Sequence, residues 1–245
     1  MLGIGVSTFN RPEHLRWVLT QIKKHTTGEY KVFVYNDGQF MTTEWTMQMD
    51  KEIADSNFTI MSSPIQGKGI ARSKNECLYA LKDCDHIILL DDDVAPITDN
   101  WQDYFINSGY NHSCYMTDAY QRSFTGPVHT SYQMSSGVFI YLTKAVLDKV
   151  GYFNPKYGRY GYEHAGYSHR IFEAGLTPSR FICLNDTNKY IYALDLNGVK
   201  GYEWLDHKRT ITEEERTESC RINNSVYHEE TTNHQIYYEF HPDKL

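Results

Sequence analysis

The sequence lacks the marks of several common protein classes. Its five cysteines are scattered and form no C-x-x-C pair, so neither a disulfide framework nor a zinc knuckle is indicated. No apolar run reaches the length of a membrane span, and there is no internal repeat or low-complexity segment. The N-terminal residues lack the charged and long apolar regions of a secretory signal. We therefore expect one soluble, cytoplasmic domain with reduced thiols.

Basic charge is also scarce. The formal net charge is −7 over 245 residues, with no long basic run, which argues against general binding to the phosphate backbone of nucleic acids. An apolar content of 40% supports a substantial core. Twenty tyrosines are many for this length. We expect most of them to pack in the interior, and an aromatic-lined ligand cleft is the alternative.

Strand and helix patterns alternate through residues 1–100. Apolar runs predict strands at 2–9, 30–38, 57–64 and 86–93, and helical spacing predicts helices at 12–25 and 69–84. This order is typical of an open α/β sheet with mostly parallel strands. Further on, we expect a strand pair or bent strand at 131–143, helices at 144–151 and 164–176, strands at 180–186 and 189–196, and a polar helix at 212–230.

Three consecutive aspartates follow the apolar run that ends at Leu90. Like charges so close together repel one another unless something neutralises them. Side chains two apart on an extended segment face the same way, so Asp91 and Asp93 can converge on one hard cation such as Mg²⁺ or Mn²⁺. A solvated acidic turn is the alternative. The abrupt change from apolar to acidic residues favours the metal site.

Other polar residues fall where predicted strands end, which is where open α/β sheets bind ligands. Asp37 lies in an Asn-Asp-Gly segment, and a tight turn alone would explain an aspartate at this position. Lys68 and Arg72 stand at the start of a predicted helix, where they can pair with phosphate or remain solvated surface charges.

In combination these segments resemble nucleotide-sugar glycosyltransferases of family 2, which have the GT-A fold. The resemblance covers roughly residues 2 to 180. It rests on segments that occur in the family's order, namely "VSTFNRPEHLRWVL", "VFVYNDGQ", "GKGIARSKNECL", "IILLDDDVAP" and the long stretch from "SSGVFIYLT" to "RIFEAGL". It implies a mixed Rossmann-like sheet flanked by helices, in a domain over 1–205 with a nucleotide-binding half (1–100) and an acceptor half (101–205). Residues 206–245 would then be an extension that packs on or gates the active site.

The resemblance also implies an activity. The protein would move a sugar from a nucleotide-diphosphate donor, expected to be a UDP-sugar, to an acceptor hydroxyl with Mn²⁺ or Mg²⁺. A saccharide is the expected acceptor, and a protein side chain or a modified base of phage DNA are the alternatives. A catalytically inactive sugar-nucleotide-binding module is a rival function. A nucleotidyltransferase is a further rival, but it would want an early glycine-rich phosphate loop, and "STFNRP" is not one.

Matched to the family's motifs, individual residues acquire roles. Asp91 and Asp93 match the Asp-x-Asp (DxD) metal element, and Asp92 between them would reach the ribose or donor sugar. His207 is the first candidate for a third metal ligand, and His228 is the second. The remaining matches concern the substrates: Ser7 and Phe9 would contact the base, Asp37 its edge and Arg72 the diphosphate, while Gly137 would let a sugar approach the backbone.

The sequence departs from the family at Glu163 and His164. Family 2 usually has Glu-Asp there, with the aspartate as base in inverting members, and the retaining polypeptide N-acetylgalactosaminyltransferases have Glu-Asn. Three catalytic interpretations follow: His164 is the base, Glu163 is the base, or both bind hydroxyls in a retaining enzyme. A purely structural pair at a helix start is the fourth interpretation. The sequence leaves the stereochemistry open.

Overall fold

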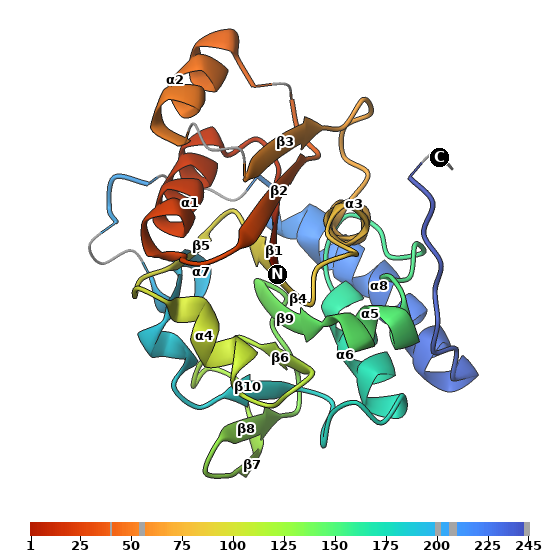
Figure 1. Cartoon of the computed structure of the whole chain (residues 1–245). Helices are drawn as coiled ribbons and strands as arrows, with labels where there is room; N and C mark the ends of the chain where they lie inside the picture. The colour runs from red at the N-terminus through yellow and green to blue at the C-terminus, as the bar shows by residue number, and fades with distance from the viewer. Residues whose placement is uncertain (40, 54–56, 199–201, 206–209, 243–245) are drawn as a thin grey trace.

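The computed structural model describes residues 1–39, 41–53, 57–198, 202–205 and 210–242 (Figure 1). A six-stranded sheet forms its centre, in the order β3-β2-β1-β4-β9-β6. Strands β1 to β4 are parallel, whereas β9 runs antiparallel to both β4 and β6. The strands are β1 (Leu2–Thr8), β2 (Tyr30–Asn36), β3 (Phe58–Ser62), β4 (His86–Asp91), β6 (His112–Cys114) and β9 (Phe139–Thr143).

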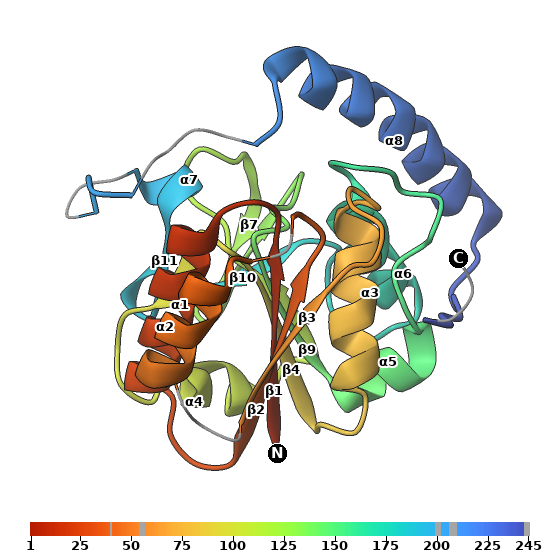
Figure 2. The same ribbon diagram turned by 90° about the horizontal axis from the view of Figure 1, so that it is seen from above.

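Helices cover both faces of this sheet (Figure 2). One face carries α1 (Pro12–His25), α2 (Thr43–Ile53) and α4 (Trp101–Ile106), and the other carries α3 (Ile70–Ala80), α5 (Lys144–Val150) and α6 (Glu163–Glu173). The long helix α8 (Glu213–Asn233) packs against α6. The arrangement is a three-layer α/β sandwich with α8 added at one side.

Two smaller sheets complete the described part of the chain. The first is β10-β8-β7, formed by Ile182–Leu184, His129–Tyr132 and Arg122–Thr125, and the second pairs β11 (Ile191–Ala193) with β5 (Val94–Pro96). A short 3₁₀ helix, η1 (Thr187–Lys189), precedes β11, and α7 (Leu194–Asn197) follows it.

The apolar runs become central strands because both of their faces are buried. In β4, Ile88 and Leu90 join the core on one side of the sheet, and Ile87 and Leu89 join the core on the other. Close packing of α3 on β1 requires a glycine at position 5. A Cβ on Gly5 would lie only 2.7 Å from the Cβ of Cys77 on α3.

The structure confirms the predicted α/β fold class and differs from the predicted elements in several places. Helices α2 and α4 and strands β5, β6 and β7 were not predicted. The segment 131–143 forms β8 and β9, which belong to different sheets instead of pairing with each other. The segment 189–196 ends in helix α7. The predicted halves 1–100 and 101–205 both contribute strands to the one central sheet, because β6 and β9 extend it beyond β4.

The parallel strands bring their polar ends together at one edge of the sheet. Ser7 pairs in register with both Tyr35 and Asp91, and Thr8 pairs with Asn36. The ends of β1, β2 and β4 are therefore neighbours, as the strand pattern predicts.

Candidate active site

A cavity of about 420 Å³ opens at this edge of the sheet. It is bounded by the ends of β1 and β4, the loop before α3, the start of α6, and residues of α7 and α8. Most of the residues that the sequence singled out line it: Ser7, Phe9, Asp37, Asp91, Asp92, Asp93, Gly137, Glu163 and His164. The side chains of Lys68 and Arg72 do not belong to this lining. His207 lies outside the described residues.

Two of the three aspartates are held by the end of β1 and the turn after it. Arg11 donates through Nη1 to Asp92 Oδ1 at 2.9 Å and to Asp93 Oδ2 at 3.2 Å. Thr8 Oγ1 donates to Asp92 Oδ2 at 2.6 Å. Burial raises the pKa of both carboxyls, and the positive charge of Arg11 opposes this effect. Asp92 is therefore fully engaged with the protein, whereas Asp93 keeps one oxygen uncommitted.

That oxygen and one of Asp91 give the test of a metal site. Asp91 Oδ1 and Asp93 Oδ1 are both buried and have no hydrogen-bond partner in the described part of the chain. Burial raises the pKa of Asp91 to about 6, and the positive charge of Lys74 opposes this rise. In the described segments no three His, Cys, Asp or Glu side chains form a ready-made metal cluster. Two carboxylates completed by substrate phosphates are what Mg²⁺ commonly uses, so the residues fit.

The second candidate for a third ligand does not reach this place. His228 is exposed on α8 and does not line the cavity. Asp195, at the start of α7, lines the cavity and its charge raises the pKa of Asp93. The acidic side of the cavity thus includes a carboxylate that the sequence patterns did not single out.

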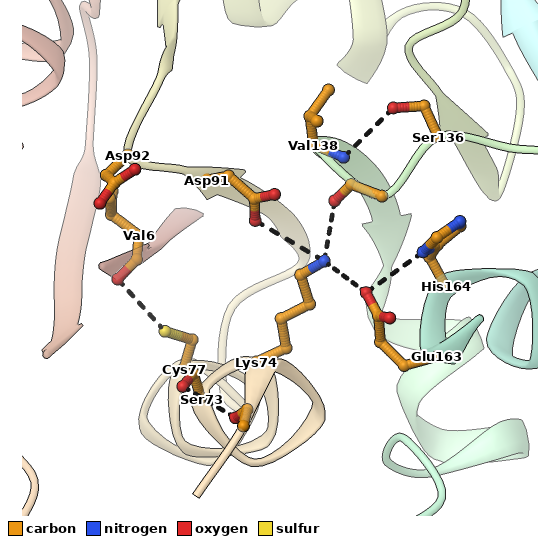
Figure 3. A network of polar contacts seen from close by, with 12 residues as sticks. Val6, Ser73, Lys74, Cys77, Asp91, Asp92, Ser136, Val138, Glu163 and His164 are labelled. Atoms are coloured by element: carbon orange, nitrogen blue, oxygen red, sulfur yellow. Dashed lines mark hydrogen bonds and ion pairs between the residues drawn. The ribbon is translucent and has the colours of Figure 1, made fainter. Parts of the chain in front are cut away.

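A buried lysine on α3 connects the metal side of the cavity with the Glu163 side (Figure 3). The Lys74 side chain is 1% exposed, and its Nζ lies 3.0 Å from Glu163 Oε1 and 3.7 Å from Asp91 Oδ1. It also donates to the carbonyl oxygen of Gly137 at 2.8 Å. Burial opposes the charge of Lys74, but the two carboxylates outweigh this effect and raise its pKa.

Glu163 opens helix α6 and is buried. Burial raises its pKa, but Lys74 and then His164 outweigh this effect, and the net pKa is lowered. Its second oxygen, Oε2, is buried without a hydrogen-bond partner among the residues described. Glu163 is therefore an ionised carboxylate with one free oxygen.

His164 has both ring nitrogens engaged. Nε2 lies 3.0 Å from the carbonyl oxygen of Ser135, and Nδ1 lies 3.2 Å from Glu163 Oε1. A carbonyl and a carboxylate both only accept hydrogen bonds, so both contacts are satisfied when the ring donates from each nitrogen. Gly137 provides the room for this ring, because a Cβ there would lie 2.6 Å from His164 Nδ1. These two contacts fix the orientation of the His164 ring.

Asp37 binds the loop before α3. Its Oδ1 accepts from the backbone N–H of Lys68 at 3.1 Å, and its Oδ2 accepts from that of Gly69 at 2.8 Å. Burial raises the pKa of Asp37, and these two N–H groups oppose the rise. Asp37 thus shapes this end of the cavity, and Lys68 contributes its backbone.

Arg72 points to the C-terminal segment. Its guanidinium pairs with Glu76 at 2.6 Å, donates to the carbonyl oxygen of Pro242 at 2.6 Å and lies over the ring of Phe240. Among the described residues, Arg159 and Arg216 are the arginines that line the cavity besides Arg11. The structure brings the C-terminal segment to Arg72 and places two other arginines near the ligand space.

No protein-family model matches the chain. A glycosyltransferase of Acanthamoeba polyphaga mimivirus, itself uncharacterised, is 26% identical over 208 residues, which are 76% of this chain and 79% of that protein. GalNAc-T7 with UDP, GalNAc and Mn²⁺ aligns with a TM-score of 0.62 at 12% identity, over 82% of this chain and 46% of that chain. TarS of S. aureus aligns with a TM-score of 0.59 at 16% identity, over 78% and 36%.

This chain has a GT-A glycosyltransferase fold. A third solved structure agrees: the mannosyltransferase PcManGT of Pyrobaculum calidifontis, with GDP-Man and Mn²⁺, has a TM-score of 0.52 at 15% identity, over 74% of this chain and 55% of that one. The chain spans 36% to 55% of the length of these three solved chains. The predicted resemblance to GT-A glycosyltransferases is confirmed at the level of the fold.

Besides Asp195, four cationic side chains at this site were missed by the sequence patterns. Lys74 and Arg11 lie inside segments that were singled out for other residues. Arg159 belongs to a glycine-rich loop and Arg216 to a polar helix, where a charge is ordinarily solvated. Only the approach of distant segments reveals that Arg11, Arg159 and Arg216 line one cavity and that Lys74 pairs with two of its carboxylates. No helix in the described part of the fold is long and apolar enough to cross a membrane.

Proposed function

We propose that this protein transfers a sugar from a nucleotide-diphosphate donor, a UDP-sugar in the first instance, to a hydroxyl of an acceptor saccharide. The observation that carries the proposal is the convergence, in one cavity, of the Glu163–His164 pair and two carboxylates, Asp91 and Asp93, each with a buried oxygen that has no hydrogen-bond partner among the described residues. The glycosyltransferases with similar folds, one crystallised with UDP and Mn²⁺ and one with GDP-Man and Mn²⁺, support it. Acceptors on a protein or on a modified DNA base remain the alternatives, and a cytoplasmic location remains a prediction.

The donor occupies the nucleotide end between Phe9 and the Asp37 loop. Ser7 and Phe9 contact the base there, as the resemblance implies, and the diphosphate lies toward Asp91 and Asp93. These two aspartates would hold Mn²⁺ or Mg²⁺, which when bound supplies positive charge to the diphosphate leaving group. Arg159 and Arg216 line the same cavity and add positive charge to it.

Glu163 is the group that we propose for the acceptor. The hydroxyl oxygen of the acceptor attacks the anomeric carbon, the bond from that carbon to the diphosphate oxygen breaks, and the hydroxyl proton moves to Glu163 Oε2. Lys74 and His164 lower the basicity of this carboxylate, so the proton moves late, when the new C–O bond has largely formed. His164 acts by orienting Glu163, through its bonds to Ser135 and to the carboxylate.

A donor screen tests the function. We expect one UDP- or GDP-sugar to raise the melting temperature in the presence of Mn²⁺, and its slow hydrolysis to release the nucleotide. Asp93→Asn should abolish the metal-dependent part of the shift, whereas Asp83→Asn, an exposed aspartate on the turn before β4, should leave it unchanged. Binding without any release would favour the inactive binding module. Neither binding nor release with any common donor would refute the proposal.

A further inference from the structure

One wall of the cavity is a loop, residues 158–162, that leads into α6. Arg159, Tyr160, Gly161 and Tyr162 all line the cavity. The guanidinium of Arg159 lies over the ring of Phe9, 5.5 Å from its centre. The guanidinium of Arg216 lies over the ring of Tyr160 at 5.3 Å. The position of this loop therefore decides where two cationic side chains stand.

The loop belongs to no helix or strand, so no regular ladder of hydrogen bonds holds its backbone. Gly161 and Tyr162 have left-handed φ values of +90° and +69°, which cost conformational energy in the case of the tyrosine. The loop also packs closely on the loop before α3, because a Cβ on Gly69 would lie 2.6 Å from the carbonyl oxygen of Gly158. Such a backbone requires partners from elsewhere in the fold.

Asn223 of α8 supplies those partners. Its Oδ1 accepts from the N–H of Gly158 at 3.0 Å, and its Nδ2 donates to the carbonyl oxygens of Tyr160 and Gly161, both at 2.8 Å. The residue is 1% exposed. The primary amide offers one acceptor and two donors in a fixed plane, which are the three groups that the loop uses. Aspartate has the same shape but no donors, and leucine has neither.

We propose that Asn223 is a positioning residue for the nucleotide donor: it fixes the loop 158–162 and thereby places Arg159 and Tyr160 against the donor. The inference rests on the proposed function, because it concerns the same cavity. It assigns to Asn223 of α8 a part in donor binding that acts through the loop, although α8 stands at the far end of the sequence from β1 and β2.

The buried contacts of α8 lie on the helix face that carries Asn223, which supports this role. Arg170 of α6 and Glu230 of α8 form a buried ion pair at 2.7 Å, and Tyr157 donates to Glu230. Asn223 stands two turns before Glu230 on the helix, so the ion pair holds the face that carries the amide. Cys220, one turn earlier, lies against Gly161, where an added Cβ would meet its Sγ at 2.9 Å. A fixed helix thus presents a fixed amide to the loop.

The test compares Asn223→Leu and Asn223→Asp with the same changes at Asn224, the next residue of α8, which is partly exposed. Binding of UDP and of GDP with Mn²⁺ is measured by calorimetry, well below the melting temperature of each variant. We expect both Asn223 variants to bind the preferred nucleotide at least about tenfold more weakly, and the Asn224 variants to bind within about twofold of the wild type. A merely structural role would lower the melting temperature and leave this affinity unchanged.

Hydrogen exchange gives a second readout that needs no variant. In the wild type, nucleotide should slow the exchange of residues 158–162 and of the α8 turn around Asn223 together. Unchanged affinity in both Asn223 variants would overturn the inference, and so would nucleotide binding that protects neither segment. If the wild type binds neither nucleotide, the proposed function fails and the inference fails with it, whereas binding that is indifferent to Asn223 overturns the inference alone.

Discussion

At the scale of single residues, the cavity depends on a lysine that solvent scarcely reaches. Lys74 lies between Glu163 and Asp91, two carboxylates from distant parts of the chain. A buried charge is tolerated only when it is paired and hydrogen-bonded, and Lys74 satisfies both conditions. The same contacts keep Glu163 ionised at the place where the acceptor is proposed to bind.

Lys74→Met should be severely destabilising. It removes the cation and leaves the buried Glu163 carboxylate and the partly exposed Asp91 carboxylate without their partner. Breaking a buried pair costs about 3–5 kcal/mol. Urea unfolding would measure the loss. Lys31→Met, at an exposed position of β2, is the matched control and should change little. Adding Glu163→Gln to Lys74→Met should restore part of the stability, and no recovery would contradict the pairing.

Glu163→Gln and His164→Ala separate the two members of the pair. Glu163→Gln should lower kcat at least about 100-fold, the range for loss of a general base, with little change in donor affinity. His164→Ala should cost less, because the histidine acts through Glu163. Steady-state kinetics with the donor found in the screen would measure both. A larger loss in His164→Ala would identify the histidine as the base.

At the scale of elements, the fully buried side chains by which α8 joins the domain are polar rather than apolar. Its sequence is polar, and only Asn223 and Glu230 are fully buried among its described side chains. A Thr212–Glu215 capping box begins the helix. The predicted extension 206–245 thus has, in its described part, a helix whose buried polar groups meet specific partners. We propose that it packs on the active site instead of gating it.

Glu230→Gln should loosen α8. The change leaves the Arg170 guanidinium buried without its counter-charge, so we expect a loss of about 3–5 kcal/mol. Glu229→Gln is the matched control, since Glu229 is the preceding residue and forms an exposed ion pair with Lys156. Removing such a surface pair costs about 1 kcal/mol or less. Thermal unfolding of both variants measures these losses of stability, and equal losses would contradict the role of the buried pair.

At the scale of the whole molecule, one cavity is assembled from both halves of the chain. The nucleotide end comes from β1, β2 and the loop before α3, and the opposite wall comes from α6, α7 and α8. The halves share a single sheet through the β4–β9 pairing. A change that destabilises this sheet therefore also destabilises the site.

Acid should weaken the fold through buried histidines. His112 of β6 is fully buried, lies 2.8 Å from Ser168 Oγ of α6, and burial lowers its pKa to about 4. The unfolded chain protonates this ring near pH 6.5. Because the folded pKa is the lower one, its contribution is complete above pH 6.5 and declines as the pH falls toward 4.

The free energy of unfolding, measured by urea between pH 7 and 4, should show this decline. His112→Leu should reduce the slope by at most about 1.4 kcal/mol per pH unit, whatever its effect at pH 7. His129, with its smaller downward pKa shift and partial exposure, is the control position, and His129→Leu should alter the slope less. An identical slope in wild type and His112→Leu would refute the prediction.

The sequence by itself determined the α/β class and the acidic end of β4. Local rules suffice for these, because an apolar run with two buried faces forms a central strand, and parallel strands bring their ends to one edge. The positions of Asp91, Asp93 and Glu163 in one cavity follow from such rules together with the family's motif order. Helix α2 was not predicted because its apolar residues are few and its polar residues are many.

The tertiary structure alone decided what the charges do. Asp92 and Asp93 meet Arg11, Glu163 meets Lys74, and Asn223 meets the loop 158–162, in each case across more than sixty residues of chain. Arg72, expected at the diphosphate, meets the C-terminal segment instead. A charge has no periodicity that reveals its partner, since its energy depends on burial and on distance to other charges. Those quantities exist only after the chain has folded.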